Sequence, residues 1–374
     1  MHSETTRVTA AAEQNHAGPS DEARMVSDAA DRILREQCTG ALIDAAEAGA
    51  WPASLWATLV EAGLPLASAP ERFGGSELPL AEGLSLLRLA GMHALPLPLA
   101  ESMLASALLG ATTCENLPPG PLIPVVAGPA DRVTARDVDG RVVIDARIER
   151  VPFAPCAGTL LLVLPAARGP GTRLALVPIA SLRLDTERTI AGEPAATITL
   201  TDHAVDASAC HDVALEPQRI RARLALGRAL MIAGGLQSIL DMSCAYALDR
   251  TQFGRPLAAF QAIQQQLAVL AGEAAAAIRA ADRALEALGG DDELIEIAVA
   301  KARAGEAAGR GAEIAHQVHG AMGFTHEHAL HQRTRRLWSW RDQHGNESEW
   351  QAWLGRRICA EGADQLWSFV TRSG

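Results

Sequence analysis

The stretch Asp249-Arg250-Thr251-Gln252-Phe253-Gly254-Arg255-Pro256-Leu257, followed closely by Phe260-Gln261, decides how this sequence is interpreted. It lies between two long segments rich in alanine and leucine, which favour helices. A helix that ends in Arg-x-x-Phe-Gly, turns, and begins again at Phe-Gln can present a guanidinium, an aromatic face and an amide together. These groups suit the pyrophosphate, the rings and the polar edges of a dinucleotide. The alternative is that Arg250 and Arg255 are solvated cations at helix ends.

The composition limits the class of protein. With 374 residues, the chain can bury a large core and form two or three subdomains. A formal net charge of -11 argues against general binding to nucleic acid or to an anionic membrane, but it permits one basic pocket for a phosphorylated ligand. The six cysteines are scattered, so we expect free thiols in a reducing cytoplasm. We expect neither a secretory signal nor a transmembrane helix, because no apolar run is long and uninterrupted enough.

The character of the sequence changes along the chain. Residues 1–20 are polar and predict a disordered N-terminus, and helical periodicity dominates residues 21–117. Residues 118–216 hold short apolar or alternating segments separated by Gly, Pro and Asp, which is typical of a β-domain. Three long amphipathic segments within residues 217–374 predict an antiparallel bundle. The expected fold is α+β and mostly α: an N-terminal helical domain, a middle β-barrel or β-sandwich domain and a C-terminal four-helix bundle.

A second motif supports the interpretation of the first. Gln317-Val318-His319-Gly320-Ala321-Met322-Gly323-Phe324 resembles the Gln-x-x-Gly-Gly-x-Gly-Phe segment of the acyl-CoA dehydrogenase family, and the stretch from Arg250 to Gln261 resembles the flavin-binding signature of that family. The resemblance, with the domain order, spans roughly Ala23 to Thr371. It implies α,β-dehydrogenation of an acyl-CoA thioester, FAD as the cofactor and an electron-transfer flavoprotein or similar acceptor.

The resemblance also implies which residues contact FAD across a subunit interface. Arg250 would pair with the pyrophosphate, and Phe253 and Gln261 would line the adenosine end. Gly320 and Ala321 would bring the backbone close to the cofactor, where small residues are needed. Ala321 stands where the family usually has a second glycine, so the approach is expected to be slightly looser. The full implied set is Arg250, Gln252, Phe253, Leu257, Phe260, Gln261, Gln317, Gly320 and Ala321.

The residue expected to perform the chemistry is missing. The reaction needs a general base to remove the proton α to the thioester, and the family uses a glutamate. One family position for this glutamate corresponds to His344, next to Gly345, and the other to Ala225. Neither is a carboxylate, so the catalytic residue stays unassigned. His344 itself, Asp342 and Glu347 are the open candidates, and the alternative is an ordinary turn without a catalytic group.

The middle domain departs from the family too. The family places backbone donors and a ring against the isoalloxazine at positions that correspond to residues 124–131 and 146–153, and neither segment keeps the family pattern. The sequence thus retains the residues for adenosine and pyrophosphate and lacks those for the flavin ring. This asymmetry predicts the non-base subunit of a heteromeric α2β2 enzyme, which completes the FAD site of a paralogous partner. The alternatives are a self-sufficient homo-oligomeric enzyme with a non-standard base, and a non-catalytic binding or scaffold protein of the same fold.

Clusters of His, Trp and Arg near the C-terminus have simpler explanations. The histidines fall on different helix faces without a Cys or carboxylate to complete a tetrahedral set, so no metal site is expected. The tryptophans suit either a subunit interface or core packing. The arginines between residues 333 and 341 could attract the phosphates of CoA or FAD, or form a solvated helix face. The histidines concerned are His316, His319, His326, His328 and His331.

Overall fold

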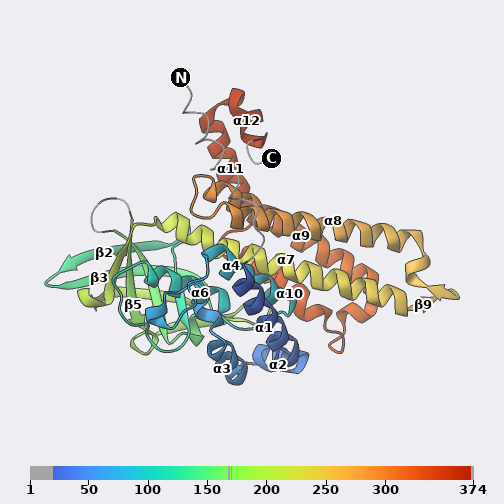
Figure 1. Cartoon of the computed structure of the whole chain (residues 1–374), viewed down its shortest axis with the longest axis horizontal. Coiled ribbons are helices and arrows are strands. Elements are labelled where there is room, and N and C mark those ends of the chain that lie inside the picture. The colour runs from blue at the N-terminus through green and yellow to red at the C-terminus, as the bar shows by residue number, and fades with distance from the viewer. Residues whose placement is uncertain (1–19, 167–168, 170, 372–374) are drawn as a thin grey trace, which may run out of the picture.

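The structure is a computed structural model that describes residues 20–166, 169 and 171–371. Figure 1 shows a β-domain at one side, a group of short helices beside it, and long helices that project away from both. The predicted fold, mostly α with a β-domain between two helical regions, is confirmed. The predicted disordered segment lies outside the described residues except for Ser20, whose side chain accepts a hydrogen bond from the backbone N–H of Ala23 and caps the first helix.

Short helices form the N-terminal region. The last of them is apolar nearly all round and almost fully buried, as expected for a helix enclosed by other elements. Its first half packs in the core of the helical regions, and its second half packs against the β-domain. It therefore joins the two parts of the molecule. The α-helices of this region are α1 (Asp21–Gln37), α2 (Gly40–Glu47), α3 (Ala53–Glu61), α4 (Leu80–Ser85), α5 (Leu87–Met92) and α6 (Leu99–Gly110).

The β-domain holds two sheets with a common core. Strand β4 explains how the domain is attached, because successive side chains of a strand point to opposite faces. Leu160 and Leu162 face the core between the sheets, whereas Leu161 and Val163 face α6. Of the two expected forms, the described strands make the sandwich. The sheet orders are β1-β4-β5-β8 and β2-β3-β7-β6, with β1 (Leu122–Val125), β2 (Arg132–Val138), β3 (Arg141–Pro152), β4 (Thr159–Pro165), β5 (Thr172–Pro178), β6 (Leu184–Arg188), β7 (Pro194–Asp206) and β8 (Cys210–Val213).

The long helices α7, α8 and α9 form the bundle, and α10 packs against α7 and α9. Helix α7 also lies against α5 at very short range. A Cβ added at Gly234 would lie 1.9 Å from the carbonyl oxygen of Arg88, and one at Gly91 would lie 1.9 Å from that of Met231, so both helices need glycine at the crossing. The bounds are α7 (Pro217–Asp249), β9 (Thr251–Gln252), β10 (Arg255–Pro256), α8 (Gln261–Glu286), α9 (Glu293–His319), η7 (Gly320–Phe324), α10 (Leu330–Asp342), α11 (Glu347–Glu361) and α12 (Leu366–Thr371).

Helix α7 is not amphipathic, although the sequence predicts an amphipathic segment there. Among the described residues, it is the one helix whose length and composition would suffice to cross a membrane. Of its most apolar window, 83% is buried inside the protein. This is the environment of a core helix, and it explains why α7 is apolar on nearly all sides.

Candidate cofactor and base sites

The two sequence motifs meet at the far end of the long helices. Helix α7 ends at Asp249, α8 begins at Gln261 and α9 ends at His319, so all three termini lie at the same end of the antiparallel bundle. The ring of Tyr246 stacks on the ring of His319, with centroids 4.5 Å apart. Figure 1 shows the β9 hairpin at this projecting end. The fold thus brings together the two segments that the sequence analysis assigned to one cofactor.

The first motif forms a tight hairpin with an exposed aromatic tip. Strands β9 and β10 pair antiparallel around Phe253 and Gly254, both of which have positive φ. The guanidinium of Arg255 lies 4.1 Å from the ring centroid of Phe260, and the ring of Phe260 meets that of Phe253 edge-on at 6.2 Å. Phe253 is nevertheless 93% exposed. The hairpin therefore places a cation next to an aromatic face, but this cation is Arg255, and the role predicted for Arg250 stays a prediction.

Most of the implied FAD-binding residues face solvent. Leu257 and Phe260 are half-buried, and the other seven are exposed. Within the described part of the chain, the side chain of Arg250 has neither an ion pair nor a hydrogen bond. Most of the other described arginines are paired with carboxylates, so the unpaired guanidinium of Arg250 stands out among them. These groups remain free to bind a ligand or a second chain.

Gly320 is the first glycine of the second motif, and its backbone conformation requires glycine. Its φ of 57° and ψ of -139° place it in a region that residues with a Cβ rarely adopt. No atom of the chain lies within 4 Å of the position that a Cβ would take. The requirement is therefore conformational within this chain, and the space beside Gly320 is open.

The base position predicted at His344 lies in the turn between α10 and α11. Gly345 has a φ of 100°, and a Cβ there would lie 2.8 Å from Trp350 Nε1 and 2.9 Å from Arg221 Nη2, so glycine is needed. The indole N–H of Trp350 donates to the carbonyl oxygen of His344 at 3.2 Å. The residue pair His344-Gly345 is thus held rigidly against α7 and α11.

The second base position, Ala225, lies on the face of α7 that meets this turn. Arg221 and Arg228 are one turn before and after it, so the three share a face. Arg228 donates to Gln343, and a Cβ on Gly345 would touch Arg221. The two positions at which the family places its glutamate therefore converge at one place in this fold. Here they hold a methyl group and an imidazole.

The environment of His344 keeps its imidazole neutral. Burial holds the pKa of His344 well below its usual range, and the nearby charges of Arg228, Arg221 and Lys301 lower it further. Its Nε2 is buried and has no hydrogen-bond partner among the described residues. Lys301 is fully buried, and burial lowers its pKa to about 7. An imidazole of depressed pKa among three basic side chains is a weak base for a weakly acidic C–H.

The nearest carboxylates are bound to arginines. Glu349 pairs with Arg221 at 2.6 Å, and Glu347 accepts from Arg341 Nε at 2.8 Å. The hydrogen bonds from Arg341 lower the pKa of Glu347, which takes it further from the range of a general base. Asp342 is exposed. None of these groups offers a free, desolvated carboxylate next to Ala225 and His344.

Glu101 was missed by sequence reasoning. It is 2% exposed and forms an ion pair with Arg228, which is 1% exposed. The signal was present, since Glu101 is the one charged residue in the apolar helix α6. A charge buried in such a helix requires a partner from elsewhere in the fold. Its partner fills the space beside Ala225.

Two β-domain segments correspond to those that face the flavin ring in the family. In this chain, a ring and a backbone donor of these segments already have partners inside the protein. Phe153, at the end of the segment 146–153, is 1% exposed and lies in the core between the two sheets. In the segment 124–131, the backbone N–H of Gly128 donates to Asp131 Oδ2 at 2.7 Å. Neither the ring nor this donor is available to a ligand.

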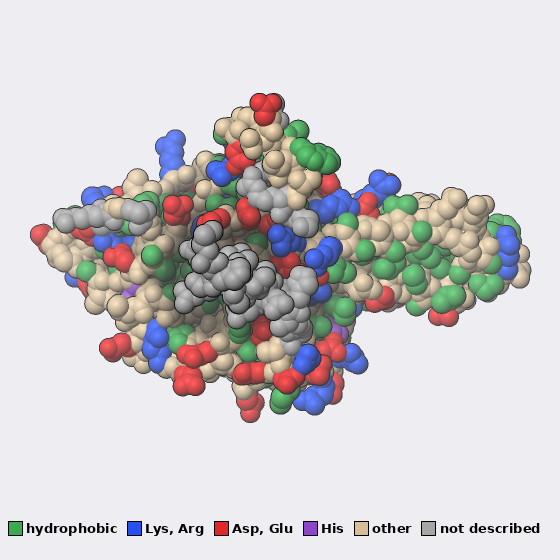
Figure 2. Space-filling model, turned by 45° about the horizontal axis from the view of Figure 1, so that its top comes forward, with side chains coloured by type: hydrophobic (Ala, Val, Ile, Leu, Met, Phe, Trp, Pro, Cys, Tyr) green, Lys and Arg blue, Asp and Glu red, His purple; other side chains and the backbone are tan. Residues whose placement is uncertain are grey.

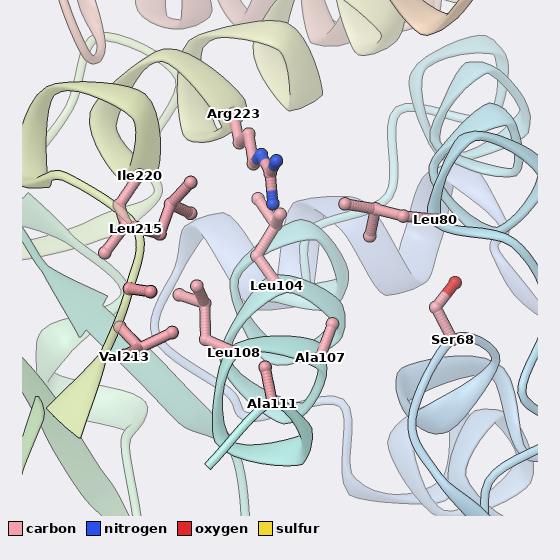
Figure 3. A pocket seen from close by; sticks show the side chains of 11 residues that line it. Ser68, Leu80, Leu104, Ala107, Leu108, Ala111, Val213, Leu215, Ile220 and Arg223 are labelled. Carbon is pink, nitrogen blue, oxygen red and sulfur yellow. The ribbon is translucent and has the colours of Figure 1, made fainter. Parts of the chain in front are cut away.

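A cavity of about 380 Å³ lies between α6, the start of α7 and the segment that joins β8 to α7. Figure 3 shows its mostly apolar wall, with the guanidinium of Arg223 at one edge. Arg223 is bonded to the buried Glu293 at 2.6 Å. Ala225 and His344 do not line this cavity. The cavity and the base positions therefore lie on different sides of α7.

Comparison with known proteins places the chain in a family. Residues 20–113 match the family description "Acyl-CoA dehydrogenase, N-terminal domain", and residues 218–346 match "Acyl-CoA dehydrogenase, C-terminal domain". The chain belongs to the acyl-CoA dehydrogenase family. The members of this family are FAD-dependent oxidoreductases, so the class predicted from the two motifs is confirmed.

A curated relative and several solved structures match most of the length of this acyl-CoA dehydrogenase family member. The chain is 26% identical over 317 residues to "Acyl-CoA dehydrogenase IpdE2" of Mycobacterium tuberculosis, covering 84% of this chain and 90% of that protein. The ChsE4-ChsE5 complex from Mycobacterium tuberculosis matches with a TM-score of 0.84 and 21% identity, covering 91% of this chain and 98% of that chain. A structure described as the Tcur3481-Tcur3483 steroid ACAD matches with a TM-score of 0.80 and 24% identity, covering 92% of this chain and 99% of that chain.

Proposed function

We propose that this chain is the non-base subunit of a heteromeric acyl-CoA dehydrogenase. The paralogous partner would supply the glutamate and the pocket for the flavin ring, and this chain would complete the FAD site in trans. The complex would catalyse α,β-dehydrogenation of an acyl-CoA and pass electrons to an electron-transfer flavoprotein or similar acceptor. The observation that carries the proposal is the convergence of Ala225 and His344 in an enclosure where Glu101, Glu347 and Glu349 are each bound to an arginine and Asp342 faces solvent.

The exposed end of the bundle fits one half of an FAD site. In this proposal Arg250 binds the pyrophosphate, Phe253 and Gln261 line the adenosine end, and Gly320 lets the backbone approach the cofactor. FAD, when bound, supplies the acceptor for the hydride that leaves Cβ of the thioester. The lack of a partner for Arg250 within the described residues and the 93% exposure of Phe253 both support a ligand held from outside the chain. The remaining proposed contacts are Gln252, Leu257, Phe260, Gln317 and Ala321.

The surface of the projecting helices supports a partner subunit. Figure 2 shows hydrophobic side chains spread over this arm of the molecule. Leu248 is 64% exposed, Val269 is 38% exposed and Phe253 is 93% exposed. Apolar side chains that form a contiguous exposed patch mark an interface with another protein. The descriptions of two matching structures as a ChsE4-ChsE5 complex and a Tcur3481-Tcur3483 pair agree with a heteromeric assembly.

The proposed substrate is a bulky apolar acyl-CoA. This class is suggested by the matching structure described as a steroid ACAD. The apolar cavity of about 380 Å³ lies away from Ala225 and His344, so we assign it no catalytic role in this chain.

Expression of the chain alone, and then together with a paralogous subunit that carries the glutamate, tests the proposal. We expect a colourless and inert protein alone, and gain of FAD and of acyl-CoA oxidation on co-expression. In the active complex, His344→Ala in this chain should leave kcat within about two-fold, because His344 performs no proton transfer. Stoichiometric FAD and acyl-CoA oxidation by the chain alone would overturn the half-site proposal. His344, Asp342 and Glu347 would then be the bases to replace.

A further inference from the structure

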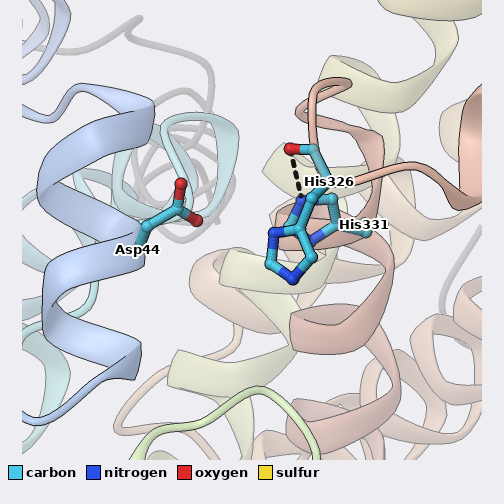
Figure 4. Close-up of side chains that lie close together, drawn as sticks. All are labelled: Asp44, His326 and His331. Carbon is cyan, nitrogen blue, oxygen red and sulfur yellow. Dashed lines mark hydrogen bonds between the residues drawn. The ribbon is translucent and has the colours of Figure 1, made fainter.

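Three side chains that can bind a metal meet between α2 and the start of α10. Asp44 lies on α2, His326 lies in the loop that follows η7, and His331 lies in the first turn of α10. One ligand atom from each lies within 4.8 Å of the other two. Figure 4 shows the carboxylate of Asp44 directed from its helix toward the two imidazoles. The sequence predicted no metal site because it showed no carboxylate next to the histidines, and the fold supplies one from the opposite end of the chain.

The carboxylate is already held in place by a neighbouring side chain. The amide Nε2 of Gln332 donates to Asp44 Oδ1 at 2.7 Å and to the carbonyl oxygen of Gly40 at 3.0 Å. These bonds fix α2 against α10 and orient Asp44. Metal-binding carboxylates are commonly oriented by hydrogen bonds of this kind. The second oxygen of Asp44 has no hydrogen bond within the described residues and can accept a cation.

The ring of His331 is oriented by contacts at both of its nitrogens. Its Nε2 points to the carbonyl oxygen of His326 at 3.4 Å, and Arg335 donates to its Nδ1 at 3.0 Å. Arg335 is also hydrogen bonded to Glu47. A metal bound at Nε2 requires the proton on Nδ1, so Arg335 would turn fully to Glu47.

The ligand atoms are spaced somewhat more widely than those of an occupied zinc site. Zinc binds histidine nitrogen and carboxylate oxygen at about 2.0–2.2 Å in a tetrahedron, so its ligand atoms lie roughly 3.3–3.5 Å apart. In the structure the three ligand atoms lie within 4.8 Å of one another, so zinc binding would draw them closer together. Two imidazoles and one carboxylate leave the fourth position to water.

We propose that Asp44, His326 and His331 form a zinc site that ties α2 to the loop between η7 and α10. The site is independent of the proposed half-site function. Zinc binding would nevertheless affect the proposed FAD half-site, because η7 contains Gly320 and Ala321 of the second motif. Zinc binding would restrain the segment that follows this motif, and it would stabilise the folded chain, since the ligands converge only in the native state.

Zinc titration of the full-length, untagged chain after EDTA treatment and dialysis tests the site. Calorimetry should detect one equivalent of zinc bound in the micromolar range or tighter, and zinc should raise the thermal midpoint. His326→Gln and His331→Gln should each weaken binding more than about ten-fold, since even changes around ligands have effects of this size. Asp44→Asn should act in the same direction while it keeps the hydrogen bond from Gln332.

The matched control is His203→Gln, a histidine of β7 far from the site in the fold, which should leave zinc affinity unchanged. Circular dichroism checks that each variant is folded; His326 is exposed, so its variant is expected to fold normally. The proposal fails if the wild-type chain binds no zinc. It also fails if His326→Gln and His331→Gln bind zinc as tightly as the control does, because the zinc would then lie elsewhere. These outcomes do not depend on FAD or on a partner subunit.

Discussion

The free end of the long helices and the enclosure around His344 differ in whether their charged side chains are exposed and unpaired or buried and paired. At the free end, Arg250 has no partner within the described residues and Phe253 is 93% exposed. In the enclosure, Arg228 is 1% exposed and is bound to Glu101, which is 2% exposed. A buried charge that is paired inside the chain serves the fold, because an unpaired one would be strongly destabilising. An unpaired charge at the surface is free to serve a ligand or a partner. Variants of the two regions should therefore fail in different ways.

The largest effect is expected at the buried pair of Arg228 and Glu101. Arg228→Ala leaves the carboxylate of Glu101 buried without its cation, so it should lower the free energy of unfolding by about 3–5 kcal/mol. Urea denaturation of the chain measures this loss. The double variant Arg228→Met with Glu101→Leu should recover most of it, because apolar residues can replace a buried pair at little net cost. An unchanged denaturation midpoint for Arg228→Ala would mean that the enclosure is not a structural unit.

At the free end, Arg250→Gln should weaken FAD binding by the complex about 10- to 100-fold, which is the size of a lost charge-assisted hydrogen bond. The denaturation midpoint of the chain alone should not change, since the side chain of Arg250 makes no hydrogen bond or ion pair within the described residues. Flavin fluorescence during dialysis of the co-expressed complex measures retention. Arg183→Gln removes another exposed arginine and is the matched control. Equal losses of FAD in both variants would remove the distinction between the two regions.

The buried Lys301 should make the stability of the folded chain depend on pH. Burial lowers the pKa of Lys301 to about 7, from an ordinary lysine value of about 10.5, so between these values the unfolded chain binds a proton that the folded chain does not. Stability should therefore rise with pH across this window, by at most about 1.4 kcal/mol per pH unit from this group. Urea denaturation at several pH values between 7.5 and 9.5 measures the slope. Lys301→Met should have a smaller slope than the wild type, and parallel slopes would show that Lys301 is not the titrating group.

A smaller loss of stability than at Arg228 is expected at Gly320. Gly320→Ala forces a Cβ into a backbone conformation with a φ of 57° and a ψ of -139°, which should destabilise the chain by about 1–3 kcal/mol. If the backbone approaches the cofactor at Gly320, the variant complex should lose more FAD than the loss of stability alone would cause. Ala321→Gly is the control, because it restores the residue that the family usually has. Wild-type stability and FAD retention in Gly320→Ala would contradict the role assigned to this position.

Much of the fold follows from local patterns in the sequence. Helical periodicity marked the bundle, and alternating apolar residues with turn signals marked the strands, because both patterns record which side of an element faces the core. The turn at Asp139-Gly140 is an example: both residues have positive φ between the paired strands β2 and β3. The sequence did not distinguish a barrel from a sandwich, since that depends on how two sheets pack. It also predicted an amphipathic segment at α7, which is not amphipathic because a helix enclosed on all sides has no polar face.

The sequence by itself determined the family, through two motifs whose residues are close neighbours along the chain, and it determined that neither family position for the base holds a carboxylate. Only the tertiary structure decided that Ala225 and His344 share one enclosure with the pair of Glu101 and Arg228. It likewise decided that Asp44 joins His326 and His331. The physical reason is the same in each case. Residues of one short motif lie close together because they are neighbours along the chain. Side chains from distant segments meet only when packing of the core sets the distances between helices.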